Sequence, residues 1–146
     1  MKGTVISINI SHKKGIKKVP ISEIYITTEG LEGDAHSGPW HRQVSLLAEE
    51  SIIKMRKLGL DVQYGDFAEN ITTRGIVLYD LPLGTKLKIN DVILEITQIG
   101  KKCHEECAIK QQTGKCIMPK EGVFAKVIES GHMKINDSIE ILEKGV

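Results

Sequence analysis

The chain has 146 residues, of which 20 are Lys or Arg and 19 are Asp or Glu, for a formal net charge of +1. This length suits one domain that buries roughly 68–70% of the surface of its unfolded chain. The near-neutral charge argues against a nucleic-acid binder, and an aromatic content of 4% argues against a platform on which bases stack. No apolar run is long enough to cross a membrane, and no secretory signal is visible, so we expect a cytoplasmic protein.

The first third of the chain alternates between strand patterns and loops. Thr4–Ile10 is rich in β-branched residues and predicts a strand, and Ile21–Thr28 predicts another. The basic stretch Lys13–Lys18 between them reads as a hairpin tip or a solvated surface loop. Gly30–Arg42 holds three glycines and a proline in thirteen residues, which predicts a loop.

One segment has the pattern of an amphipathic helix, Leu47–Leu58. Ala48, Ile52 and Met55 fall on one face at spacings of four and three. Acidic residues in its first turn and basic residues in its last suit the helix dipole. Gly59 then predicts a left-handed cap.

The rest of the chain reads as β, apart from a short helical turn expected at Asp66, with Glu69 reaching back to cap it. The strand candidates are Gly84–Lys88, Val92–Ile99, Val123–Ile128 and Ser138–Leu142. The sequence Lys-Ile-Asn-Asp at 88–91 recurs at 134–137, and Asn-Asp suits tight hairpin turns. These patterns predict a mostly β domain, a closed or half-closed barrel with one main helix and short helical turns.

The three cysteines of the chain, Cys103, Cys107 and Cys116, lie close together in the sequence. No leader sequence is visible before them. Such a cluster indicates metal binding or reactivity more than a disulfide framework. Lys101, Lys102 and His104 flank Cys103, and nearby cations favour the reactive thiolate, whereas the two glutamates at 105 and 106 oppose it. Zinc is an alternative, because Cys103 and Cys107 have the spacing of a ligand pair that Cys116 and His104 can complete.

A second group of candidates lies in the glycine-rich loop. Gly33 permits close approach of the backbone to a ligand, and Asp34, His36 and Arg42 place an acid, an imidazole and a cation in one loop. Arginine is scarce in this chain, so Arg42 and Arg74 are candidate fork donors to an anionic group. Surface ion pairs are the simpler interpretation of each arginine taken alone.

Further weak candidates follow at Gly65–Asn70 and at 116–122. In the first segment, Glu69 can be a capping residue and Asn70 a turn former. In the second, Pro119 and Gly122 predict a loop in which Lys120 can face an anion.

The order of these motifs resembles that of the MOSC domain, the C-terminal module of molybdenum-cofactor sulfurases, also found as stand-alone bacterial proteins. The resemblance covers nearly the whole chain, which we treat as one domain, 1–146. Gly30–His36 with Arg42 is similar to the family's GxxGDxH…R loop, and Gly65–Asn70 to its G…EN segment. Further similarity lies at Leu83-Gly84, at the strand end that carries the family's cysteine (100–103), at 116–127 and at the closing segment 131–137.

The resemblance implies a β-barrel-like fold and a pocket for the molybdenum cofactor, a pterin with a dithiolene and a phosphate (molybdopterin). It implies that Arg42, Arg74 and Lys120 contact phosphate or an oxyanion, and that Gly33, Asp34, His36 and Asn70 contact the pterin or support the loop. Cys103 is the functional cysteine by position. Cys107 and Cys116 depart from the family pattern, which has one functional cysteine. Each can be a thiol without a role, a resolving thiol or a zinc ligand.

The resemblance leaves three functions open. In the first, a persulfide on Cys103 carries sulfur and delivers it to the cofactor or to a molybdoenzyme. This chain has no room for the pyridoxal-phosphate domain that makes the persulfide in the long sulfurases, so a separate cysteine desulfurase would supply the sulfur. Cys103 can instead ligate molybdenum in a small reductase of N-hydroxylated compounds. The alternative outside the family is a zinc-binding β-domain with an interaction role and no catalysis. The oligomeric state stays open.

Overall fold

The computed structural model describes residues 2–14, 16–100 and 121–145. The elements in chain order are β1 (Lys2–Ile10), β2 (Val19–Ile21), β3 (Glu23–Thr27), β4 (Gly30–Leu31), β5 (Val44–Ala48), α1 (Glu49–Lys57), β6 (Ile71–Arg74), the 3-10 turn η1 (Leu78–Asp80), β7 (Lys86–Ile89), β8 (Val92–Ile99), β9 (Val123–Glu129), β10 (Gly131–Lys134) and β11 (Ser138–Glu143).

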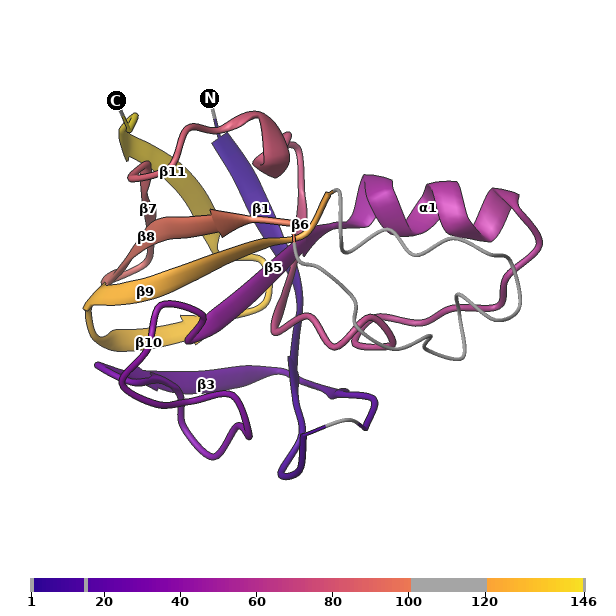
Figure 1. Cartoon of the computed structure of the whole chain (residues 1–146), viewed down its shortest axis with the longest axis horizontal. Coiled ribbons are helices and arrows are strands. Elements are labelled where there is room, and N and C mark those ends of the chain that lie inside the picture. Colours follow the sequence, from indigo (N-terminus) through magenta and orange to yellow (C-terminus); the bar gives the residue numbers. More distant parts are fainter. Residues whose placement is uncertain (1, 15, 101–120, 146) are drawn as a thin grey trace.

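Seven of the described strands close into a barrel, in the order β11-β7-β8-β9-β5-β6-β1, with β1 pairing back onto β11. Adjacent barrel strands are antiparallel except β5 and β6, which are parallel. Strand β2 adds to the far part of β1, and β10, β3 and β4 form a separate sheet beside the barrel (Figure 1). The expectation of a mostly β, barrel-like fold is therefore confirmed.

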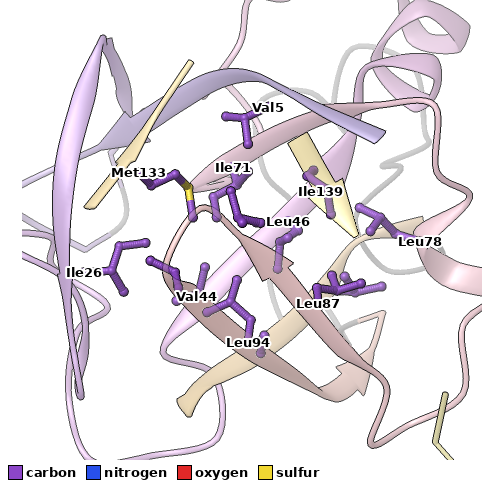
Figure 2. Packing of buried hydrophobic residues seen from close by; sticks show 14 of the residues in the cluster. Val5, Ile26, Val44, Leu46, Ile71, Leu78, Leu87, Leu94, Met133 and Ile139 are labelled. Carbon is purple, nitrogen blue, oxygen red and sulfur yellow. The ribbon is translucent and has the colours of Figure 1, made fainter. Parts of the chain in front are cut away.

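The barrel interior is filled by apolar side chains that point inward from each strand (Figure 2). Strand β1 alternates over its first half, where Gly3 and Val5 are buried and Thr4 and Ile6 partly exposed, whereas Ser7, Ile8 and Asn9 are all buried. A second apolar cluster, in which Leu47, Ile52 and Met55 take part, packs α1 against the outside of the barrel. Figure 1 shows α1 projecting away from the barrel wall.

The predicted helix begins two residues too early. Leu47 and Ala48 belong to β5, where they pair with Thr72 and Thr73 of β6. Strand β5 is buried on both faces, because Leu46 faces the barrel core and Leu47 the α1 cluster. Its apolar residues therefore do not alternate with polar ones, and the run merges with the helix pattern. In the described part of the chain, no helix has the length and apolarity needed to span a membrane.

The helical turn expected at Asp66 is wrong. Residues 64–67 form a turn without a helix, and the Asp66 carboxylate accepts the N–H of Gln63. Glu69 does reach back, but to the N–H of Gly65, at 2.9 Å. The left-handed cap at Gly59 is confirmed, with φ of +95°.

The two Lys-Ile-Asn-Asp copies have one backbone feature in common and different roles. In both copies the Asn has a positive φ, 54° at Asn90 and 76° at Asn136. The first copy turns β7 into its antiparallel partner β8, as a hairpin. The second copy connects β10 to β11, which lie in different sheets, so it is a corner and not a hairpin.

Candidate functional site

Asp34 fixes the glycine-rich loop to the end of β1. Gly33 adopts a φ of +81°, a conformation that favours glycine, and the chain then buries the Asp34 carboxylate. Its Oδ1 accepts the backbone N–H of Ser11 at 3.1 Å, and its Oδ2 accepts the backbone N–H of His36 at 3.0 Å. Asp34 thus joins two segments that lie 23 residues apart in the sequence.

Lys18 is the cation that pairs with Asp34. Its Nζ lies 2.7 Å from Asp34 Oδ1, and both side chains are inaccessible to solvent. Burial raises the pKa of Asp34, but the hydrogen bond and charge of Lys18 together with the N–H groups of Ser11 and His36 outweigh it, so that the pKa lies below its ordinary 3.8. The interpretation of Lys13–Lys18 as a solvated loop is therefore wrong at Lys18, although the other described lysines there are exposed.

Trp40 and Arg42 form the far end of the same loop. The indole N–H of Trp40 donates to the carbonyl of His36 at 2.8 Å. The guanidinium carbon of Arg42 lies 4.7 Å from the centre of the Trp40 ring and 5.6 Å from that of Phe124 on β9. Arg42 Nε is buried and has no hydrogen-bond partner among the described residues. A buried donor without a partner is costly, which marks this atom as a place where a ligand can bind.

The loop also contacts the place where the cysteine-bearing segment leaves and rejoins the barrel. The Gly100 N–H donates to the Gly122 carbonyl at 2.6 Å, which closes the two ends of that segment. His41 Nε2 lies 2.9 Å from Gln98 Oε1, and the Thr97 hydroxyl donates to the carbonyl of His41. The 33–42 loop therefore lies beside both ends of the segment.

Two of the predicted site residues, Cys103 and Lys120, lie outside the described residues, as do Cys107 and Cys116. The structure describes neither their positions nor the zinc alternative built on them. Among the residues that are described, no group of three His, Cys, Asp or Glu side chains is placed to hold a metal ion.

Asn70 lies inside the scaffold rather than on a binding surface. It is fully buried, its Oδ1 accepts the N–H and the hydroxyl of Ser45, and its amide donates to the carbonyl of Asn9 at 3.2 Å. These contacts join β5 to β1 at the point where the parallel strand β6 begins. The polar atoms of the Asn70 side chain are thus used within the barrel.

Arg74 lies apart from the other candidates. It pairs with Thr4 near the start of β1, whereas Ser11 follows its end, and seven residues of strand span roughly 23 Å. Its Nε donates to Glu49 at 2.7 Å, and the Tyr64 hydroxyl donates to the other oxygen of that carboxylate. The Arg74 hydrogen bond, aided by the bond from Tyr64, outweighs partial burial and lowers the pKa of Glu49. The structure therefore brings together Gly33, Asp34, His36 and Arg42, but not Arg74.

The model of the MOSC domain family matches residues 33–140. The chain belongs to the MOSC domain family. MOSC domains are associated with binding of the molybdenum cofactor. The match begins at Gly33, so it contains the whole 33–42 loop, whereas Lys18 lies outside it.

Solved structures share this MOSC fold. The YuaD protein from Bacillus subtilis superposes with a TM-score of 0.80 at 16% identity, over 95% of this chain and 94% of that one. YiiM from Geobacillus stearothermophilus gives 0.74 at 20% identity, over 99% and 77% of the two chains, and YiiM from Escherichia coli gives 0.71 at 19%, over 99% and 71%. No curated protein matches the sequence.

Sequence reasoning missed two residues of this site. Lys18 is one of several lysines in a basic stretch, and no local signal distinguishes it from its neighbours. Trp40 did carry a signal, because it is the single tryptophan of the chain and lies within the candidate loop.

Proposed function

We propose that the chain binds the molybdenum cofactor at the 33–42 loop and that Cys103 carries sulfur beside it as a persulfide. The family supports the cofactor class. The observation that carries the proposal is the buried Nε of Arg42, which has no hydrogen-bond partner among the described residues, on a guanidinium that lies against the rings of Trp40 and Phe124.

The charges around this loop fit an anionic ligand. Asp34 neutralises Lys18, whereas Arg42 and Lys14 both approach the Trp40 ring, with Lys14 Nζ 5.5 Å from its centre. Two cations on one ring leave net positive charge at the loop. A guanidinium whose Nε lacks a partner suits a phosphate or another oxyanion, which accepts two N–H groups at once.

Each polar residue of the loop would have a separate role in binding the cofactor. Arg42 would hold an oxyanion of the cofactor, His36 would contact it through the imidazole, and Asp34 would keep the loop on β1. The cofactor itself, when bound, supplies a dithiolene-held molybdenum that exchanges electrons or sulfur with a substrate.

The sulfur step needs only a thiolate and a persulfide donor. The Cys103 thiolate attacks the terminal sulfur of a persulfide on a separate cysteine desulfurase. An S–S bond forms at Cys103, the donor's S–S bond breaks, and the donor cysteine leaves as a thiolate. The neighbouring lysines in the sequence favour the attacking thiolate.

The cofactor half is tested by the pterin and molybdenum that co-purify with the protein from a molybdate-fed host that makes the cofactor. We expect Arg42→Met to lower the pterin per chain by about tenfold or more, since a charge-assisted hydrogen bond contributes about 1.5–3 kcal/mol. Arg56→Met is the matched control, because Arg56 also stacks on an aromatic ring, Tyr64, but its Nε already donates to the Val62 carbonyl. Wild-type protein with no pterin, or equal loss in both variants, contradicts the proposal.

The sulfur half is tested by mixing the protein with a cysteine desulfurase and cysteine, then alkylating and measuring intact mass. We expect one added sulfur in the wild type and none in Cys103→Ser, with Cys107→Ser and Cys116→Ser as matched controls that retain it. One zinc per chain that is lost in all three variants would instead support the zinc-binding alternative.

A further inference from the structure

Lys18 has more than one buried partner. Besides Asp34, its Nζ lies 3.0 Å from Nδ1 of His36 and 3.4 Å from the hydroxyl of Ser11. Lysine is almost never fully buried unless it is paired, and this residue is only 2% exposed. An ammonium has three N–H donors, and the structure gives it three acceptors.

The contact with His36 constrains the imidazole. An ammonium has no lone pair, so it can only donate, and Nδ1 must accept. A ring nitrogen that accepts carries no proton, so the proton of the neutral imidazole lies on Nε2.

Within the described residues, Asp34 does not support the opposite arrangement. A proton on Nδ1 would need an acceptor, and the Asp34 Oδ2 atom lies 3.9 Å away, beyond hydrogen-bond distance. That oxygen already accepts the backbone N–H of His36 at 3.0 Å.

We propose that Lys18 is a positioning residue that holds His36 as the Nε2–H tautomer, so that Nε2 acts as a hydrogen-bond donor and not as a metal ligand. The site then recognises a ligand through an acceptor, such as a phosphate oxygen or a ring carbonyl. Asp34 is part of the same device, because its carboxylate keeps the ammonium in place against Nδ1. The nature of the ligand rests on the proposed function, whereas the tautomer is a property of the chain alone.

The tautomer is measured without any ligand, by two-bond ¹H–¹⁵N correlation spectra of the imidazoles at about pH 8, above the usual histidine pKa of about 6.5. We expect Nδ1 of His36 to be the unprotonated nitrogen. Because Lys18→Met leaves Asp34 buried without its cation and can fail to fold, the informative variant is Lys18→Met with Asp34→Asn, which removes both charges. In it we expect a mixture of tautomers at His36.

The matched control is Lys17→Met, which removes an exposed neighbouring lysine whose Nζ lies 3.7 Å from Asp66. It should keep the wild-type spectrum of His36. A proton on Nδ1 in the wild type, or an unchanged tautomer in the double variant, overturns the proposal.

A second measurement tests the donor role at Nε2. In His36→Gln the amide nitrogen can occupy the place of Nε2, whereas in His36→Asn it can reach only the place of Nδ1. We expect the Gln variant to retain co-purified pterin within about threefold of wild type and the Asn variant to lose about tenfold, as for one lost hydrogen bond to a charged group. Equal loss in both contradicts the donor role. If wild-type protein holds no pterin, the proposed function fails, and the spectra alone decide the tautomer.

Discussion

Asp34 and Glu69 are both buried carboxyl groups, and their pKa values shift in opposite directions. Asp34 is 6% exposed and Glu69 fully buried. The bonds they accept from uncharged groups are alike: Asp34 accepts two backbone N–H groups, and Glu69 accepts the Gly65 N–H and the Thr72 hydroxyl, each at 2.9 Å. Burial raises the pKa of Glu69 above its ordinary 4.5, and these bonds do not reverse the shift.

The difference between the two acids is the cation. Lys18 contacts Asp34, whereas no described cation is hydrogen-bonded to Glu69, whose Oε1 has no partner in the described part of the chain. Neutral donors alone do not offset the effect of burial on the pKa of Glu69, whereas donors that include one ammonium outweigh it at Asp34. The contrast indicates that Asp34 fixes the 33–42 loop through its ion pair with Lys18, whereas Glu69 is a buried group of the barrel scaffold.

Removing the cation is expected to have the largest effect. Lys18→Met leaves the Asp34 carboxylate buried and unpaired, which typically costs about 3–5 kcal/mol of the free energy of unfolding. Combining it with Asp34→Asn should recover most of that loss. Urea unfolding of the two variants, with Lys17→Met as the exposed control, measures both. A single variant as stable as the control would show that Asp34 does not depend on Lys18.

Lowering the pH should gradually remove the contribution of the Asp34–Lys18 ion pair to the free energy of unfolding. A carboxyl whose pKa is lower in the folded state binds its proton more weakly there, so the stability from Asp34 is present above 3.8 and is lost as the pH falls below it. The free energy of unfolding of wild type minus that of Lys18→Met with Asp34→Asn should therefore decrease as the pH falls from about 5 to 3. A constant difference would contradict an ionised Asp34.

Glu69 should show the opposite dependence. Its folded-state pKa is raised, so its contribution is present below 4.5 and is lost as the pH rises through the folded value. Glu69→Gln imitates the protonated acid at every pH, so we expect its stability relative to wild type to increase from about pH 4 to pH 8. Urea unfolding across that range measures the change, and parallel curves would show that folding does not raise the pKa of Glu69.

The sequence predicted the contents of the site loop better than its supports. The sequence predicts a functional loop at 30–42 because its candidate residues all lie within one short segment: the glycines, Asp34, His36 and Arg42. The cation of Asp34 lies 16 residues away, among other lysines of the same type, so no local pattern selects it. Asn70 is expected to contact the pterin or support the loop, and its actual partner Ser45 could not be predicted, because Ser45 is 25 residues distant and only the paired strands bring the two together.

The strands follow the same rule. The β8 segment was predicted with its observed bounds because its burial alternates for most of its length and tight turns precede it. Strand β5 was not predicted, and its last two residues were assigned to the helix, because both faces of the strand are buried, a property that depends on where α1 packs. Periodicity thus predicts elements with one buried face and fails where tertiary contacts cover both.

Arg74 provides the smallest expected effect and the sharpest contrast with Arg42. Like Arg42, it is one of the few arginines of the chain and a predicted contact of a phosphate or oxyanion, but the Glu49 carboxylate already accepts its Nε and its side chain is 59% exposed. An arginine satisfied in this way, roughly 23 Å along β1 from the loop, has no reason to contact the same ligand. Arg74→Met should therefore keep the wild-type amount of co-purified pterin and change the urea midpoint only slightly. A loss equal to that of Arg42→Met would place the ligand on both ends of β1 and contradict a binding surface confined to the 33–42 loop.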